Sequence, residues 1–349
     1  MEATMDTIWK RRWIRYGSDD GYDMEATMDT IWIRQGFDKD YVPRSGDIVM
    51  NTTGGTLSKS LNLPKTMTVN IETQTNTSDE SSSPITENVP TEVVREFNGE
   101  KLLDRTTFFT EFSTNAYLED FYTKVEDPAM QMVLSFLPNI VARIGKVDKM
   151  LDFGAGPTIH VAACFREMAN EIHLADYLPQ NRDELYQWVN NKSKFDWTIP
   201  LKMILTREGQ SWDKLPRVEP ETRDKIVDIY HCDVFSNPSV DCPKEIFGQF
   251  DVLVTIFCVE YCCNTLAEYY SAIKNIAEAL KPGGHLIYGG VFEETWCSFG
   301  GRKFTCLYIT KEIMLDALAK AGLYVDETDR GCVFYEINGM FMVSAKKEL

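Results

Sequence analysis

Basic residues are scarce in this sequence. Lys and Arg number 36 against 53 Asp and Glu, which gives the 349 residues a formal net charge of −17. Association with nucleic acid or with an anionic membrane surface depends largely on an excess of positive charge. We therefore expect a protein that binds no nucleic acid.

Long apolar runs are also missing. No stretch approaches the roughly 18 uncharged apolar residues of a membrane-spanning helix, and the first 30 residues lack the apolar core of a signal peptide. The nine cysteines are odd in number and form no C-x-x-C pair, so we expect reduced thiols. These observations predict a cytoplasmic monomer with no membrane span and no bound metal ion.

The first quarter of the chain has little to build a core from. Met1–Trp9 recurs identically at Met24–Trp32, but two copies are too few for a solenoid. Residues 51–91 contain 16 Ser or Thr in 41 positions. Such a segment has too little apolar surface to bury to offset the entropy that the chain loses when it becomes ordered. We expect a poorly ordered, duplicated acidic segment over 1–50, a disordered linker over 51–91, and one domain over 92–349.

The domain from residue 92 has the pattern of an α/β protein. An apolar helical stripe over 127–144 is followed by short apolar runs that alternate with helical stretches. The predicted strands cover 149–153, 171–175, 226–232, 251–257 and 285–291, and the predicted helices cover 158–168, 179–190, 265–280 and 311–321. This alternation indicates parallel strands with helices on both faces. The runs at 304–309 and 340–345 predict a closing antiparallel hairpin.

A glycine turn follows the first predicted strand. Gly154 and Gly156 let the backbone turn sharply and approach a ligand closely, with a helix N-terminus beyond them. A dinucleotide fingerprint would need glycine where Ile159 stands, and the lysine of a phosphate-binding Walker loop is absent. Phosphate binding, and with it a dehydrogenase, is therefore disfavoured.

Acidic residues end the next two strands. Asp176 lies about two dozen residues after the first strand, where a carboxylate can accept both hydroxyls of a ribose. Asp233 ends the third strand, where it could accept from the exocyclic amine of a purine. A helix cap is the alternative explanation for Asp176, and an aspartate in the place of Asp233, taken alone, is more often a cap. Together with the glycine turn they predict an adenosyl site without a diphosphate, which points to S-adenosylmethionine.

At this point a family resemblance is visible. From about residue 109 to residue 347 the chain resembles the small-molecule N-methyltransferases that act on nicotinamide, phenylethanolamine and indolethylamine. The resemblance rests on short segments spread through the chain, namely 117–122, 151–159, 176–181, 195–197, 232–234, 257–260, 280–285 and 292–296. It implies a Rossmann-like class I methyltransferase fold, with a doubly wound, mostly parallel seven-stranded sheet and an N-terminal helical cap.

The resemblance also implies the cofactor and its neighbours. S-adenosyl-L-methionine would be bound and S-adenosyl-L-homocysteine released. The residues that would surround the cofactor come from the helical cap and from four strand ends, and they are Tyr117, Tyr122, Gly154, Ala155, His160, Asp176, Asn181, Asp233, Val234 and Ile256. Two of them depart from the family pattern, which commonly has Ser or Gly where Ala155 stands and Tyr where His160 stands.

The acceptor is predicted from two glutamates. A pyridine nitrogen is neutral at pH 7, whereas an aliphatic ammonium must lose a proton before it can attack a methyl group, which calls for nearby carboxylates. Glu260 and Glu294 resemble the glutamate pair of the family members that act on arylethylamines. The resemblance thus implies an amine N-methyltransferase in which Glu260 and Glu294 recognise and deprotonate the amine. Cys297 stands where the family tends to have Tyr.

Two alternatives stay open. Nicotinamide-type members carry one aspartate at the first glutamate position and another at the end of the fifth strand, where Gly289 and Gly290 stand here. A pyridine N-methyltransferase is therefore one alternative, and a non-catalytic S-adenosylmethionine-binding protein is the other. Methyltransferases of nucleobases or protein glutamine would need an Asp/Asn-Pro-Pro-aromatic motif after the fourth strand, and the sequence over 255–258 differs from it.

Overall fold

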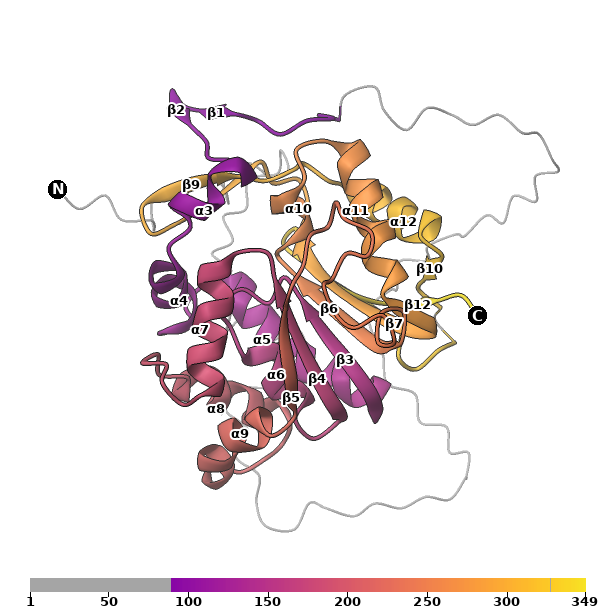
Figure 1. The fold of residues 1–349 in the computed structure, drawn as a ribbon. Helices are drawn as coiled ribbons and strands as arrows, with labels where there is room; N and C mark the ends of the chain where they lie inside the picture. Colours follow the sequence, from indigo (N-terminus) through magenta and orange to yellow (C-terminus); the bar gives the residue numbers. More distant parts are fainter. Residues whose placement is uncertain (1–88, 327) are drawn as a thin grey trace, which may run out of the picture. The chain divides into compact units, whose positions relative to one another are not determined.

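The computed structural model describes residues 89–326 and 328–349 (Figure 1). The predictions for residues 1–50 and for most of residues 51–91 lie outside this part of the chain. Its first residues already contact the domain, because the Thr91 carbonyl accepts from the Leu266 amide at 3.0 Å. Among the described residues, no helix is both long enough and apolar enough to cross a membrane.

One large sheet organises these residues. Its strand order is β10-β12-β7-β6-β3-β4-β5, and β11 pairs with β12 beside β10. The five parallel strands are β3 (Val147–Phe153), β4 (Ala169–Asp176), β5 (Ile226–His231), β6 (Phe250–Ile256) and β7 (Leu280–Val291). The three antiparallel strands are β10 (Leu323–Tyr324), β11 (Val333–Ile337) and β12 (Met340–Lys347).

The eight strands occupy seven positions across the sheet. β7 covers one side of β12, so β10 and β11 share the other side and pair with opposite ends of it. The predicted doubly wound, mostly parallel seven-stranded fold is thereby confirmed.

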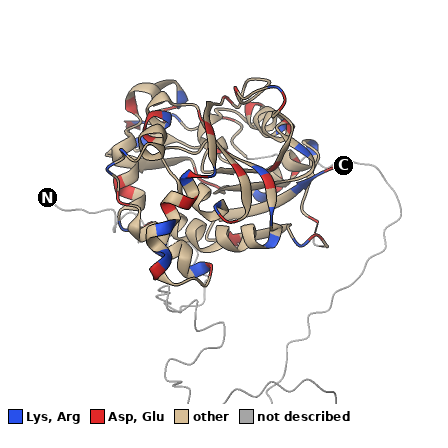
Figure 2. Ribbon diagram, turned by 60° about the horizontal axis from the view of Figure 1, so that its bottom comes forward, with Lys and Arg blue, Asp and Glu red and all other residues tan. Residues whose placement is uncertain are grey.

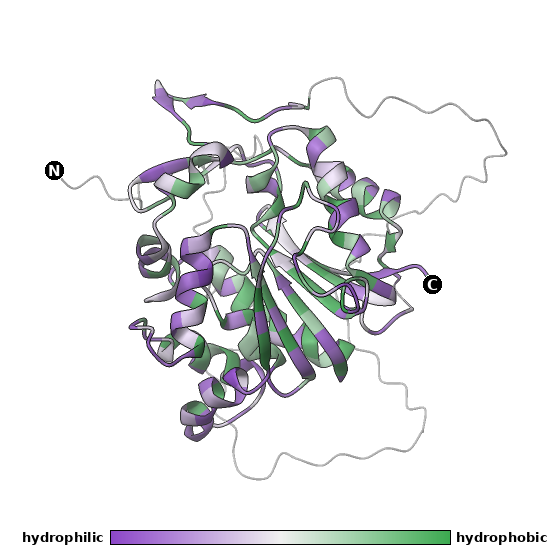
Figure 3. Cartoon of the chain, viewed as in Figure 1, coloured by the Kyte–Doolittle hydropathy of each residue, from purple (hydrophilic) through white to green (hydrophobic). Residues whose placement is uncertain are grey.

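The central strands are buried on both faces. In β3, Met150 faces one apolar cluster and its neighbours Leu151 and Phe153 belong to a second cluster on the opposite face. Side chains of a strand alternate between the two faces, so buried apolar residues at consecutive positions require a helical layer on each side. Figure 3 shows the result as a green sheet between helices that carry purple outer sides.

Helices form the two layers. The layer against the first cluster consists of α5 (Pro128–Ile144), α6 (His160–Phe165), α7 (Pro179–Val189), α8 (Thr198–Arg207) and α9 (Leu215–Arg223). The layer against the second consists of α10 (Val259–Cys262), α11 (Leu266–Glu278) and α12 (Lys311–Lys320). Acidic and basic residues are interleaved along these elements, as Figure 2 shows.

The short elements before β3 form the predicted N-terminal cap. Its main helix is α4 (Thr114–Tyr122), and Ser113 caps that helix by accepting from the Ala116 amide. The remaining small elements of the described chain are β1 (Glu96–Phe97), β2 (Glu100–Lys101), η2 (Arg105–Thr107), α3 (Phe108–Glu111), η3 (Trp212–Lys214), β8 (Trp296–Phe299) and β9 (Arg302–Thr305).

The predicted closing hairpin was wrong in one of its strands. β12 does close the sheet, but its hairpin partner is β11, whereas Phe304 belongs to β9 in a separate two-stranded sheet with β8. The turn between β11 and β12 is Asn338-Gly339, and both residues have positive φ, 52° and 79°. Asn-Gly between two apolar runs is a strong hairpin signal, because two-residue hairpin turns favour positive φ at both positions.

The other predicted elements differ mainly at their ends. The helix expected over 158–168 is shorter, because Thr158 still belongs to the glycine turn and its hydroxyl donates to the Ala155 carbonyl at 2.7 Å. α8 and α9 had not been predicted. Both pack against the first apolar cluster through a few buried residues only, so their sequence signal is short.

Candidate cofactor and acceptor site

The glycine turn after β3 is held in place by the neighbouring strand. The amides of Gly154 and Ala155 both donate to the Ala175 carbonyl in β4, each at 2.9 Å. Gly154 has φ +74°, and a Cβ built there would lie 2.4 Å from the Cys258 sulfur. Only glycine satisfies both conditions, so the backbone at this point approaches the start of α10 directly.

Asp176 ties the glycine turn to α7. It is buried, and its Oδ2 accepts from the Gly156 amide at 2.8 Å. Its Oδ1 accepts from the Leu178 amide at 2.8 Å and from the Asn181 side chain at 3.1 Å. Burial raises the pKa of Asp176, and these three donors oppose that rise. The residue therefore organises the carboxyl ends of β3 and β4, whatever it does for a ligand.

Asn181 connects this edge to the cap. Its side-chain oxygen accepts from the Thr114 hydroxyl at 3.0 Å, at the first residue of α4. α4 in turn carries Tyr117 and Tyr122, whose ring centroids lie 6.1 Å apart. Burial raises the pKa of both phenols, so both stay protonated and can act as donors. The structure thus brings the predicted cap residues to the strand ends.

His160 is buried next to the cap, among side chains that offer its ring no hydrogen bond. Its ring packs against Tyr122 at 5.2 Å between centroids, and Tyr122 in turn packs against Trp197 at 5.4 Å. Neither ring nitrogen has a hydrogen-bond partner in the described part of the chain. Burial lowers the pKa of His160 to about 3, so the ring is neutral at every physiological pH. Trp197 had been assigned no role from the sequence.

Asp152 is a candidate residue that the sequence argument missed. It lies in β3, is 2% exposed, and its Oδ2 has no hydrogen-bond partner among the described residues. Burial, with a contribution from the Asp176 charge, raises the pKa of Asp152 well above its usual value. An acidic residue inside an apolar strand was the available signal, because an unpartnered buried carboxyl is costly and uncommon.

The segments that follow β5 and β6 differ in backbone conformation and in hydrogen bonding. The Asp233 carboxylate accepts from the Phe235 amide at 2.9 Å and from the Ser236 hydroxyl at 3.2 Å, so it caps its own turn, with Val234 buried beside it. After Ile256, which is half-buried at the end of β6, the chain takes a left-handed conformation at Phe257, where φ is +49°. Such a conformation is rare for a bulky residue and is typical of strand ends at functional sites.

The Glu260 side chain is fully buried. Neither carboxylate oxygen has a hydrogen bond of ordinary geometry within the described residues, although the Val291 amide and the Tyr288 hydroxyl act on it from nearby. Burial raises the pKa of Glu260 to about 8. A Cβ built on Gly290 in β7 would lie 2.7 Å from Oε1, so the carboxylate fills the space that a side chain at position 290 would take.

Glu294 lies half-buried in the segment after β7, close to the same groups as Glu260. Burial raises the pKa of Tyr261 well above its usual value, and the nearby thiols Cys297 and Cys306 and the charges of both glutamates raise it further. Burial and the same two charges also raise the pKa of Cys297 to about 12. The structure therefore gathers both predicted catalytic acids around Tyr261 and Cys297.

Comparison with known proteins identifies the family. The family model described as NNMT/PNMT/TEMT matches residues 100–348. Nicotinamide N-methyltransferase from Caenorhabditis elegans is 34% identical over 245 residues, which cover 68% of this chain and 89% of that protein. The chain belongs to the NNMT/PNMT/TEMT family. Indolethylamine N-methyltransferase from Oryctolagus cuniculus is 32% identical and covers 52% of this chain and 68% of its own length.

A solved structure of an O-methyltransferase family protein from Burkholderia thailandensis gives a TM-score of 0.45 at 15% identity, covering 70% of this chain and 63% of that one. It is too distant to argue from, so the assignment depends on the sequence relatives. As a member of the NNMT/PNMT/TEMT family, the protein is an S-adenosylmethionine-dependent N-methyltransferase of small molecules.

The residues at the strand ends fit S-adenosylmethionine. At Gly156 a Cβ would meet no atom closer than 4.0 Å, so the backbone of the turn is open there. Asp152 Oδ2 and the two nitrogens of His160 are buried polar atoms that no described residue satisfies. A ligand with an amino group, a carboxylate and ribose hydroxyls offers the donors and acceptors that such groups lack.

Proposed function

We propose that this enzyme methylates the nitrogen of a small-molecule amine, with Glu260 and Glu294 as the two acids that receive it. The observation that supports this proposal is that the charges of both glutamates act on Tyr261 and on Cys297 and raise the pKa of each, so both carboxyl groups lie in the neighbourhood of these two side chains. That cluster follows β6 and β7, and Cys258, just after β6, lies beside the glycine turn of β3. Acceptor and cofactor sites would then be adjacent, as direct methyl transfer requires.

The cofactor would be held by the residues named from the sequence. The turn at Gly154 and Ala155, with Tyr117, Tyr122 and His160 above it, suits the methionine part. Asp176 and Asn181 suit the ribose and amino-acid ends, and Asp233, Val234 and Ile256 suit the adenine side. When bound, S-adenosylmethionine supplies a methyl group that is activated by a positively charged sulfur.

The two glutamates suit different tasks. Glu260 is fully buried and its pKa is about 8, so at neutral pH it is mostly an uncharged acid until a cation approaches. An ammonium nearby would lower that pKa and favour the carboxylate, which couples binding of the amine to ionisation of Glu260. Glu294 is half-buried and so better placed to pass the amine proton to water.

A pyridine acceptor is the second candidate, favoured by the name of the nicotinamide N-methyltransferase relative. It differs in chemistry, because a pyridine nitrogen needs no base. The space that a carboxylate on strand β7 would need at position 290 is already filled by the Glu260 carboxylate. A carboxyl group therefore stands there in either case, and this contact alone does not separate the two acceptors.

A labelled-methyl assay across arylethylamines, other amines and pyridines tests the proposal. If an amine is the acceptor, Glu294→Gln should lower kcat/KM at pH 7 by about 10²-fold or more, with partial recovery at high pH where the free amine is neutral. Affinity for S-adenosylmethionine should stay the same.

Glu293→Gln is the matched control. Glu293 is exposed and adjacent in the chain, so its neutralisation should leave kcat/KM within about twofold. A pyridine as best substrate, with Glu294→Gln as mild as the control and no recovery with pH, would refute the amine acceptor and the catalytic role of Glu294.

A further inference from the structure

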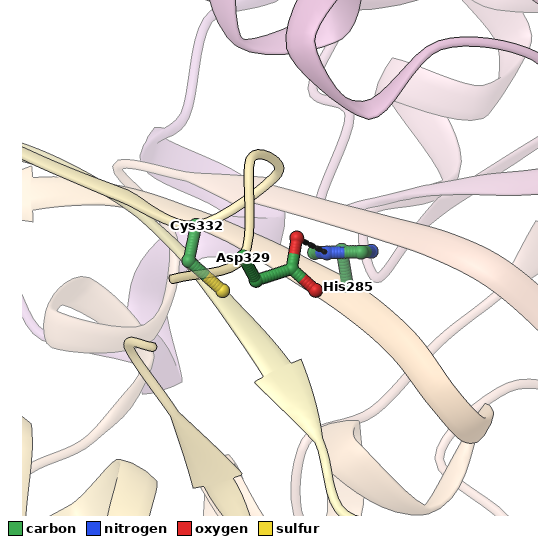
Figure 4. A group of neighbouring side chains, drawn as sticks. All are labelled: His285, Asp329 and Cys332. Carbon is green, nitrogen blue, oxygen red and sulfur yellow. Dashed lines mark ion pairs between the residues drawn. The ribbon is translucent and has the colours of Figure 1, made fainter. Parts of the chain in front are cut away.

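Three side chains of different chemistry meet away from the carboxyl ends of the parallel strands (Figure 4). His285 lies in the first half of β7, and Asp329 and Cys332 lie in the segment between β10 and β11. One imidazole nitrogen, a carboxylate oxygen and the thiol sulfur all lie within 4.8 Å of one another. Cys332 is buried, and the side chains of His285 and Asp329 are only 13% and 20% exposed.

The turn over 329–332 presents two of these groups together. The Cys332 amide donates to the Asp329 carbonyl at 3.1 Å, and the Gly331 amide donates to the Asp329 Oδ1 at 2.7 Å. A Cβ on Gly331 would lie 2.6 Å from the His285 Nε2, so glycine lets the turn come up to the imidazole. Two ligands from a tight turn and one from a distant strand are a common way to build a metal site.

The contacts within the protein leave this cluster incompletely satisfied. Lys346 donates to the Asp329 Oδ2 at 2.6 Å and the Gly331 amide donates to Oδ1, so each carboxylate oxygen has one donor and keeps a second lone pair for a metal ion. The Cys332 thiol donates to the Tyr324 carbonyl at 3.7 Å, and backbone groups of Asp326 and Lys346 lie near the sulfur. The His285 Nε2 is buried and lies 3.7 Å from Asp329, beyond hydrogen-bond distance, so no described residue satisfies it. A buried ring nitrogen in this state calls for a ligand.

We propose that His285, Asp329 and Cys332 bind one zinc ion, with water in the fourth position. Nitrogen, oxygen and sulfur donors together suit zinc, whose bonds of about 2.0–2.3 Å place tetrahedral ligand atoms roughly 3.3–3.8 Å apart. The three groups need to approach by only about 1 Å. The ion displaces the proton of the Cys332 thiol, and it fastens the segment between β10 and β11 to β7. This site is independent of the proposed acceptor.

Titration of the metal-free full-length protein tests the proposal. Calorimetry with zinc chloride should show one ion per chain, and addition of cobalt(II) should produce the charge-transfer absorption of a thiolate ligand. Cys332→Ser should abolish that absorption, and His285→Gln should weaken zinc binding by at least about tenfold. Zinc should raise the Tm of the unmodified protein but not that of Cys332→Ser.

Matched controls exist at a second histidine. His231 pairs with Asp241 at 3.0 Å, and Cys242 follows in the chain, so the same three residue types occur without the grouping seen at His285. His231→Gln and Cys242→Ser should bind zinc like the unmodified protein. Lys346→Met should bind zinc more tightly, because it removes the ammonium that competes for Asp329.

Three results would overturn the site. They are the lack of stoichiometric zinc binding by both the unmodified protein and Lys346→Met, a cobalt spectrum without thiolate absorption, and loss of binding in His231→Gln or Cys242→Ser. The first two need only proteins with all three ligands intact, so they remain decisive even if Cys332→Ser does not fold.

Discussion

Asp176 and Glu260 are both buried carboxyl groups near strand ends, but they differ in the hydrogen-bond donors that surround them. Asp176, at the end of β4, accepts from two backbone amides and one side-chain amide. Glu260, at the start of α10, has no hydrogen bond of ordinary geometry to any described residue, and its pKa is about 8. The protein therefore supplies hydrogen-bond donors that oppose the effect of burial on Asp176, whereas the carboxyl group of Glu260 is left to be satisfied by a ligand.

This difference suggests a division of labour. A carboxylate held by three donors has a fixed position before any ligand arrives, which suits recognition of a constant cofactor. An unpartnered acid near neutrality changes its charge when a cation binds, which suits an acceptor that must lose a proton. The four predictions below test this comparison.

The largest effect is expected for stability in Glu260→Gln. The pKa of Glu260 is about 8 in the folded protein against 4.5 for a free side chain, so the folded state favours the protonated acid. Its contribution is fully present below pH 4.5 and is lost as the pH rises through 8. The free energy of unfolding of Glu260→Gln, relative to the unmodified protein, should therefore rise by about 3–5 kcal/mol between pH 5 and pH 9.

Urea unfolding at several pH values measures this difference, with Glu293→Gln as an exposed control that should show none. A difference between Glu260→Gln and the unmodified protein that does not change with pH would mean that Glu260 is ionised in the folded state. Glu260 would then resemble Asp176 as a buried acid that is charged in the folded protein.

The next effect concerns Asp176→Ala. Losing a charge-assisted acceptor should weaken binding of S-adenosylmethionine by about 1.5–3 kcal/mol, measured by calorimetry. Asp183→Ala, at an exposed position of the same helix α7, is the control and should bind normally. Equal dissociation constants for Asp176→Ala and the unmodified protein would remove Asp176 from the cofactor site and leave it only its structural hydrogen bonds.

A smaller effect is expected at the glycine turn. Gly154→Ala and Gly156→Ala both place a side chain at positive φ, which costs about 1 kcal/mol. Only Gly154→Ala also meets the Cys258 sulfur, at 2.4 Å, whereas at Gly156 the nearest atom lies 4.0 Å away. Thermal unfolding should show Gly154→Ala as the less stable variant, and adding Cys258→Ala should remove most of the difference. Equal stabilities would show that the turn does not press against α10.

The smallest effect is expected for removal of residues 1–88. All of the candidate cofactor and acceptor residues lie within 89–349, so the free energy of unfolding should change by less than about 0.5 kcal/mol. Methyl transfer should be retained. An inactive or insoluble truncated protein would show that residues 1–88 are needed for folding or activity, and that Asp176 and Glu260 cannot be understood from residues 89–349 alone.

Local features of the site were predictable from the sequence. Gly154 and Asp176 were recognised because a strand, a glycine turn and a terminal acid follow each other closely in the chain. The Asn338-Gly339 turn is an equally local signal, because it identifies the two strands of the closing hairpin, β11 and β12, from adjacent residues of the sequence. That Glu294 and Glu260 lie near the same side chains could only be expected from the family resemblance, because this proximity depends on how α10 and β7 pack.

The sequence by itself determined the α/β class, the glycine turn and the family, since each is written in apolar periodicity or in short motifs. Only the tertiary structure decided which buried acid has donors and which has none, because burial and hydrogen bonding join residues far apart in the chain. Glu260 faces Gly290 and His285 meets Cys332 for the same reason. Their pKa values and ligand chemistry are set by neighbours that spacing along the chain does not reveal.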